Sequence, residues 1–230
     1  MEQEKGIKDG GREKRTARIV LEDVRPEEIE RRSFSIIEEE LAAMGKTLHS
    51  RQAPIIKRVI HTTADFSYAD TLYFSDHAVE QGLAAIREGA CIVTDTQMAM
   101  SGINKGLLEK HGGTVYNFMS DADVAREAKE RGITRACVCM ERAAALERPA
   151  IVAVGNAPTA LVRLYELVHS GEFSPRLIIG VPVGFVNVVQ AKELILSANV
   201  PSIIARGRKG GSNVGAAICN ALIYLLGRDI

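Results

Sequence analysis

The sequence predicts an α/β fold, in which five parallel strands form one sheet with helices on both faces. Two observations lead to this prediction. Five short apolar runs alternate with helix-like segments, as buried parallel strands do. Three of these runs end in a glycine-containing turn that leads into a helix, which is how open α/β sheets present a ligand site. The five runs cover residues 90–95, 113–119, 149–154, 176–180 and 201–206.

Length and composition favour one large domain. A chain of 230 residues that is 46% hydrophobic suits one large core better than two small ones. Its 29 basic and 29 acidic residues balance, so no bulk attraction to nucleic acid or membranes is expected. No apolar run is long and charge-free enough to span a bilayer. Residues 1–20 are charged and lack the apolar centre of a secretory signal, so they predict a disordered lead-in to a single domain, residues 21–230.

The four cysteines show no CxxC spacing. Cys91 and Cys219 lie inside apolar runs and are expected to be small buried side chains. We therefore expect no metal site and a reducing, cytoplasmic location.

Three helical segments are expected before the first of these strands, and each carries a start or stop signal. They cover residues 25–45, 54–66 and 75–89. Pro26 and Pro54 fit the first turns of the first two segments, where the missing N–H of proline is not needed. Gly45 and Gly89 fit positions just past helix ends, and Ser75 is the expected N-cap of the third segment.

Helix-like segments then follow the strands. Residues 96–103 follow the first strand, and residues 121–132 follow the second. Residues 134–147 are ambiguous, because their Ala, Met, Leu and Glu content favours a helix while RACVC alone could form a strand. The last three strands each lead into a helix, and Asn156 or Thr159 is the expected cap of the first of these.

Parallel strands place their carboxyl ends at one edge of the sheet, and ligands of such sheets bind there. Most of the unusual residues of this chain follow the strand ends, so they predict a site at this edge. Three glycine-containing loops are expected to lie side by side, which suits a ligand larger than a single phosphate group. The strand ends concerned are residues 94–95, 117–119, 155–156, 180–184 and 206–212.

The strongest charge cluster at this edge is the loop ARGRKGGSN. Arg206 and Arg208 offer paired donors to a carboxylate or phosphate. Gly210 and Gly211 let backbone N–H groups come close, and Ser212 begins a helix whose start adds positive potential. The loop therefore predicts an anion-binding site, and the alternative is a solvated basic turn. It lacks the GxxxxGKS/T and GxGxxG patterns, so it does not specifically indicate a nucleotide.

His61, at the end of the second helical segment, is the candidate catalytic residue. Lys57 and Arg58 share its helix face and disfavour the imidazolium, whereas the carboxylate of a bound ligand favours it. His61 would then carry a proton only when an anionic ligand is present, as a general acid requires. The alternative is a histidine that interacts with the carbonyl groups at the helix end.

Five motifs occur in the order RRSFSII, RVIHT, GNAPTAL, VPVGFV and RGRKGGSN. With them, the chain from about Arg25 onward resembles the precorrin-8X methylmutase (precorrin isomerase) family of cobalamin biosynthesis. The resemblance implies a flavodoxin-like three-layer α/β/α fold with a five-stranded parallel sheet, and a homodimer with active sites near the subunit interface. It also implies that a methyl group of a tetrapyrrole moves from ring carbon 11 to carbon 12. The product is hydrogenobyrinate, or cobyrinate when cobalt is already present.

The resemblance also implies roles for particular residues. The family's catalytic histidine falls on His61, which would protonate or hydrogen-bond the ring, and Ser33, Arg58 and Arg142 fall on substrate-contacting positions. The other substrate-binding residues that we expect are Asn156, Thr159, Arg206, Arg208, Gly210, Gly211 and Ser212. The arginines suit the acetate and propionate carboxylates of the substrate. A methyl shift within one molecule needs no redox or group-carrier cofactor, so none is expected.

Two alternatives remain at this point. A flavodoxin-like or Rossmann-like protein could hold a nucleotide or flavin at the same edge, but His61 would then have no role. A non-catalytic corrinoid carrier would bind the product without converting the substrate. Both the cobalt-containing and the metal-free tetrapyrrole are compatible with the sequence.

Overall fold

A mixed sheet of six strands lies at the centre of the computed structural model, which describes residues 25–227. The strand order is β1-β6-β5-β4-β2-β3. β1 runs antiparallel to β6, and all other neighbours are parallel. The strands are β1 Leu72–Phe74, β2 Cys91–Thr94, β3 Val115–Tyr116, β4 Ala150–Val154, β5 Leu177–Gly180 and β6 Ser202–Ala205. The lead-in predicted for residues 1–20 lies outside the described residues.

The prediction of a purely parallel, five-stranded sheet is wrong in one respect. The five expected strands are present and parallel, but β1 adds a sixth strand at the edge, with Leu72 opposite Ala205 and Phe74 opposite Ile203. β1 has only three residues, which is too short for a recognisable apolar run or alternation. Its pairing with β6 depends on the return of the chain from α3, and no local pattern encodes that contact.

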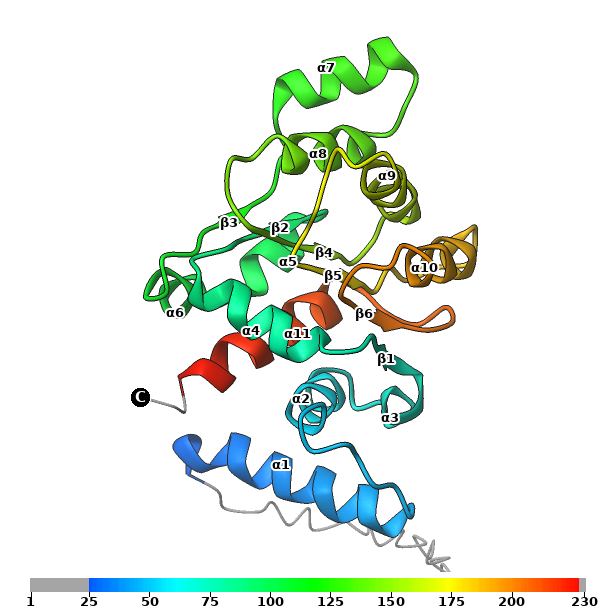
Figure 1. The fold of residues 1–230 in the computed structure, drawn as a ribbon. Coiled ribbons are helices and arrows are strands. Elements are labelled where there is room, and N and C mark those ends of the chain that lie inside the picture. The colour runs from blue at the N-terminus through cyan, green and yellow to red at the C-terminus, as the bar shows by residue number, and fades with distance from the viewer. Residues whose placement is uncertain (1–24, 228–230) are drawn as a thin grey trace, which may run out of the picture.

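Helices cover both faces of the sheet, so the described residues form three layers (Figure 1). Successive residues of β4 alternate between the two cores: Ile151 packs on one face, and Val152 packs on the other. The helices on the first face are α4 Ala78–Arg87, α5 Gln97–Gly102, α6 Lys105–Glu109 and α11 Ser212–Leu226. Those on the second face are α7 Ala122–Arg131, α8 Arg135–Ala144, α9 Pro158–His169 and α10 Val188–Leu196.

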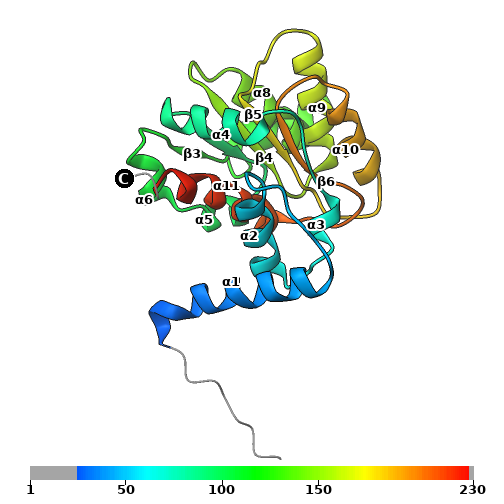
Figure 2. The same cartoon turned by 60° about the horizontal axis from the view of Figure 1, so that its bottom comes forward.

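The N-terminal helices α1 Pro26–Ala43, α2 Ala53–Thr63 and α3 Tyr68–Thr71 lie outside the first face. α2 buries Ile55, Ile56, Val59 and Ile60, and it packs against α11. α1 packs in turn on α2, and Figure 2 shows it as the outermost helix on this side. This stacking brings the end of α2, with its histidine, over the helix that follows the last strand.

The local sequence signals for helix starts agree with the structure at some helices and disagree at others. Residues 135–144 form helix α8, whose start is capped by Thr134: its Oγ1 accepts a hydrogen bond from the Cys137 N–H. The prediction that Ser75 caps α4 is wrong. The residue at the cap position is His77, with a φ of 58°. The Ser75 Oγ instead accepts a hydrogen bond from the Ser202 N–H and so joins β1 to β6.

Residues 25–227 lack two kinds of feature. None of the helices there has the length and apolar character needed to cross a bilayer. No three His, Cys, Asp or Glu side chains of these residues gather as metal ligands would.

Candidate active site

Three loops meet at the carboxyl edge of the sheet, as predicted. The Gly211 N–H donates to the Val181 carbonyl at 2.8 Å, and the Gly184 N–H donates to the Arg208 carbonyl at 3.1 Å. A Cβ on Gly210, whose φ is 157°, would lie 2.1 Å from the Val181 oxygen. A Cβ on Gly155 would lie 2.7 Å from the Cα of Ser212. The glycines of these loops are therefore needed for the close approach of the three loops to one another.

Asp95, directly after β2, occupies the start of helix α9. Its carboxylate accepts hydrogen bonds from the N–H groups of Gly155 at 2.7 Å, Asn156 at 2.9 Å and Ala157 at 2.7 Å. The side chain is 1% exposed, and this burial raises the pKa of Asp95, while the three N–H groups oppose the rise. The chain thus fills the anion position at this helix start with its own carboxylate.

The predicted capping of α9 by Asn156 or Thr159 is therefore wrong. The residue at the cap position is Ala157, and no side-chain hydrogen bond caps the helix from there. The Asn156 residue is exposed, and the Thr159 Oγ1 lies 2.9 Å from the Thr134 Oγ1. Both residues lie at the carboxyl edge, where a ligand can reach them.

The basic loop, residues 206–211, lies at the same edge, and its side chains Arg206, Arg208 and Lys209 are exposed. Arg206 pairs with Glu193 at 3.2 Å, and its guanidinium lies 5.4 Å from the centre of the Tyr73 ring. The Arg208 guanidinium lies 5.4 Å from the centre of the Phe185 ring, and Arg208 contacts no carboxylate among residues 25–227. Phe185 is 82% exposed. Arg208 and Phe185 together present a cation and an aromatic ring to solvent.

Lys209 joins this loop to the segment that follows α2. Its Nζ contacts Asp65 Oδ2 at 2.6 Å and Ser67 Oγ at 3.0 Å. The hydrogen bond from Lys209 holds the pKa of Asp65 below its usual value. Asp65 follows His61 by four positions in the sequence, so the structure brings the two predicted parts of the site together.

His61 lies in the last turn of α2 and is exposed. Its ring stacks on Phe34 of α1, with centroids 5.3 Å apart and an angle of 25° between planes. Within the described part of the chain the imidazole makes no hydrogen bond to the carbonyl groups at the helix end, which was the alternative to a catalytic role. His61 lines a cavity of about 240 Å³, bounded by Arg58, Thr62, Gly102, Asn213, Ala216, Ala217, Asn220 and Tyr224.

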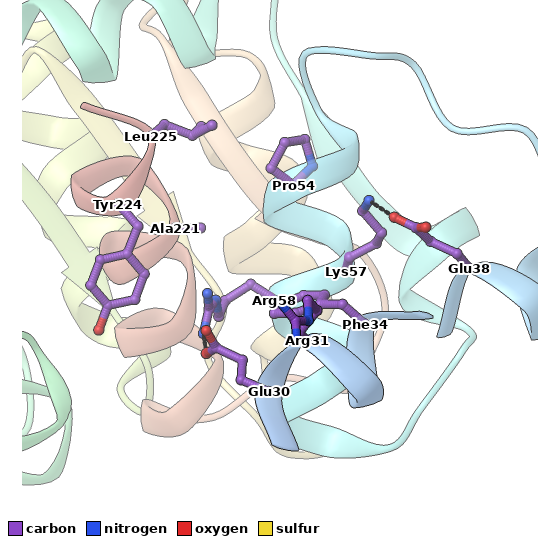
Figure 3. A pocket seen from close by; sticks show the side chains of 10 residues that line it. All are labelled: Glu30, Arg31, Phe34, Glu38, Pro54, Lys57, Arg58, Ala221, Tyr224 and Leu225. Atoms are coloured by element: carbon purple, nitrogen blue, oxygen red, sulfur yellow. Dashed lines mark hydrogen bonds and ion pairs between the residues drawn. The ribbon is translucent and has the colours of Figure 1, made fainter. Parts of the chain in front are cut away.

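Arg58 also lines a larger cavity of about 470 Å³ between α1, α2 and α11, which Figure 3 shows. Its guanidinium lies between the rings of Phe34 and Tyr224, 4.9 Å from each centroid, and pairs with Glu30. The Arg58 side chain is only 13% exposed. Two aromatic faces and one carboxylate thus fix this guanidinium beside His61.

Two other predicted residues do not line the cavity at His61. The Ser33 Oγ donates to the Ile29 carbonyl at 2.9 Å within α1, and Ser33 lines neither cavity. Arg142 lies on α8, on the second face of the sheet, where it pairs with Asp123 at 3.2 Å and Glu127 at 2.9 Å. Within one chain, Arg142 and His61 are on opposite sides of the sheet.

Sequence reasoning missed some residues that shape the site. In the sequence Asp95 stands out only as a strand-end residue, although an acid directly after an apolar strand is a recognisable signal. Phe34 stands inside the quoted motif RRSFSII, but nothing in that motif indicates that it contacts Arg58. Tyr224 lies near the end of α11 and had no signal at all.

Comparison with known proteins identifies the family. A profile of the family described as precorrin-8X methylmutase matches residues 28–225. The chain belongs to this family. It is therefore an isomerase of cobalamin biosynthesis, because a methylmutase moves a methyl group within one molecule.

Individual relatives agree over most of the chain. The cobalt-precorrin-8 methylmutase of Priestia megaterium is 45% identical over 202 residues, covering 88% of this chain and 89% of that protein. The cobalt-precorrin-8 methylmutase of Salmonella typhimurium is 46% identical over 208 residues, covering 87% and 96%. The crystal structure of a precorrin-8x methyl mutase from Thermus thermophilus superposes with a TM-score of 0.79 at 39% identity, covering 88% of this chain and 98% of that one. These matches give no support to the nucleotide, flavin or carrier alternatives.

Proposed function

We propose that this isomerase moves a methyl group from ring carbon 11 to ring carbon 12 of precorrin-8 or cobalt-precorrin-8, with His61 as the proton donor. The products are hydrogenobyrinate and cobyrinate. The observation that carries the proposal is the position of His61: an exposed imidazole in a cavity that continues to Asn213, two residues after the basic loop. The names of the relatives supply the substrate class.

The contacts of His61 suit a positioned general acid. Stacking on Phe34 fixes the plane of its ring, and Arg58 places a cation beside it. A proton given to the macrocycle draws electron density from the neighbouring ring carbons, so that the methyl bond to carbon 11 breaks as the bond to carbon 12 forms. The product then returns the proton to His61, because substrate and product are isomers. Positioning and one proton transfer then supply the catalysis.

The basic loop suits the carboxylates of the substrate. Arg206 and Arg208 are exposed and offer charge-assisted hydrogen bonds, and Gly210 and Gly211 of the same loop are proposed contacts. Phe185 adds an apolar surface for the edge of the macrocycle. The remaining proposed contacts are Ser33, Arg58, Arg142, Asn156, Thr159 and Ser212.

We also propose that the enzyme acts as a homodimer. Arg142 and His61 lie on opposite sides of the sheet, so both reach one macrocycle only if two chains contribute to one site. The exposed apolar side chains of Val183, Phe185 and Val186 supply surface for a partner or a ligand at the carboxyl edge. The family resemblance supports the same arrangement.

We further propose a flavodoxin-like arrangement for the parallel part of the sheet. When the five parallel strands β2 to β6 are numbered 1 to 5 in chain order, their order across the sheet is 2-1-3-4-5, which is the flavodoxin order. β1 is then an addition at the edge beside β6.

The test is turnover of both substrates by the purified protein. Precorrin-8 and cobalt-precorrin-8 are incubated separately with the wild type, the absorption spectrum is followed, and the position of the methyl group in the product is determined by NMR. Conversion of either substrate supports the proposal. Binding of hydrogenobyrinate or cobyrinate without conversion of either substrate would indicate a carrier and overturn the reaction.

A further inference from the structure

Lys192 on α10 is a fully buried lysine that the reaction does not use directly. It is 0% exposed, and its ammonium donates to the carbonyl oxygens of Gly207 and Lys209, each at 2.8 Å. Within residues 25–227 no carboxylate pairs with it. A buried ammonium is unfavourable unless hydrogen bonds compensate for lost hydration, and here two carbonyls of the basic loop provide them. The position of the lysine and the conformation of the loop therefore depend on each other.

A third carbonyl of the loop is held by the segment before α10. The Arg208 oxygen, between the two that Lys192 holds, accepts a hydrogen bond from the Gly184 N–H at 3.1 Å. In a planar trans peptide the C=O and N–H groups point in opposite directions. Three consecutive carbonyls directed toward α10 and its preceding loop thus turn the N–H groups of Arg208, Lys209 and Gly210 the other way. None of these three N–H groups donates a hydrogen bond within the described chain.

The same loop also braces the helix that carries His61. The carbonyl of Lys209 is held by Lys192, and the side chain of Lys209 is held by Asp65 and Ser67 in the segment after α2. Lys192 therefore holds the backbone that presents the arginines, whereas the Lys209 side chain contacts the segment after His61 through its own hydrogen bonds.

We propose that Lys192 is a positioning residue for substrate binding: it fixes the basic loop so that the N–H groups of residues 208–210 and the side chains of Arg206 and Arg208 face the carboxylates of the tetrapyrrole. This inference rests on the proposed function. Lys192 itself does not touch the substrate. Its loss therefore weakens the binding of carboxylated ligands and leaves the proton transfer by His61 largely intact.

The experiment compares Lys192→Met with the wild type, with Ile195→Ala as the control. Ile195 is buried on the same helix and packs in the core of the second face, so its variant reports a loss of packing without a loop contact. The dissociation constants are measured for cobyrinate and for a form of cobyrinate whose carboxylates are amidated, together with KM and kcat. Lys192→Met should raise KM and the dissociation constant of cobyrinate about tenfold, the scale of one charge-assisted hydrogen bond. Binding of the amidated form and kcat should stay near the wild-type values.

Lys192→Gln covers the case in which the methionine variant does not fold. Its side-chain amide retains one donor group without the charge, so the dissociation constant of cobyrinate should lie between those of the wild type and the methionine variant. Wild-type turnover with unchanged KM and cobyrinate binding in the folded Lys192 variants would overturn the role of Lys192 alone. An equal loss in Ile195→Ala, or equal weakening for the amidated ligand, would overturn it as well. Failure of the wild type to convert either substrate would instead overturn the proposed reaction.

Discussion

Replacement of Asp95 gives a quantitative test of how the site is supported. The carboxylate accepts three backbone hydrogen bonds: one oxygen serves Gly155, and the other serves Asn156 and Ala157. An asparagine can place its oxygen at the second position and keep two of them, but its NH₂ group then faces the Gly155 N–H. A hydrogen bond to a charged group contributes about 1.5–3 kcal/mol, so Asp95→Asn should lower the free energy of unfolding by about 2–3 kcal/mol.

Asp95→Ala removes all three acceptor contacts and leaves three N–H groups at a site where Asp95 was 1% exposed. The expected loss is larger, about 4–5 kcal/mol, because unpaired buried donors keep their full desolvation penalty. Urea unfolding followed by circular dichroism measures these differences. Asn156→Ala is the matched control, since its exposed side chain makes no capping bond; its effect should stay within about 0.5 kcal/mol. The reasoning would be refuted if Asp95→Ala lowered the free energy of unfolding by less than about 1 kcal/mol, or if Asn156→Ala lowered it by more than Asp95→Ala does.

Three further predictions concern charge and assembly. Burial lowers the pKa of Lys192 from 10.5 to about 8, so between these values the unfolded chain binds more protons than the folded one. Relative to Lys192→Met, the free energy of unfolding of the wild type should therefore rise by at most about 3 kcal/mol between about pH 8 and about pH 10. Urea titrations at several pH values measure this, and a difference between the two proteins that does not change with pH would contradict it. Arg206→Ala and Arg208→Ala should each weaken cobyrinate binding by about 1–3 kcal/mol in spectroscopic titrations, and unchanged affinity in both would make the loop a solvated turn. Inactive His61→Ala and Arg142→Ala chains should recover partial turnover when mixed and allowed to exchange, since both residues then act across one interface; no recovery would argue that each site lies within one chain.

The strands were predictable where their pattern is local. β4, with five buried residues in a row, and β5 and β6, each followed by a glycine-containing loop, show the apolar run typical of parallel strands. β1 was missed because three residues carry no period, and its pairing with β6 is a long-range contact. The ambiguity at residues 134–147 could have been reduced by reading Thr134 as an N-cap.

The site was predictable as a location and less so as a set of contacts. The rule that parallel strands end at one edge correctly brought the three loops together. The contact partner of each group could not be predicted from the sequence. The acid that serves the start of α9 comes from a different strand, and Arg58 is held by rings from two other helices. Lys192 looks in the sequence like an ordinary polar residue of a helix, and only the packing of α10 beneath the basic loop shows that it is buried.

The most direct measurement is the turnover of His61→Ala together with its affinity for cobyrinate. If His61 supplies the proton, kcat should fall by a factor of about 10²–10⁴, the usual contribution of general acid catalysis. The dissociation constant of cobyrinate should remain close to that of the wild type, because the arginines that bind its carboxylates are unchanged. Turnover at the wild-type rate in this variant would contradict the proposed role of His61.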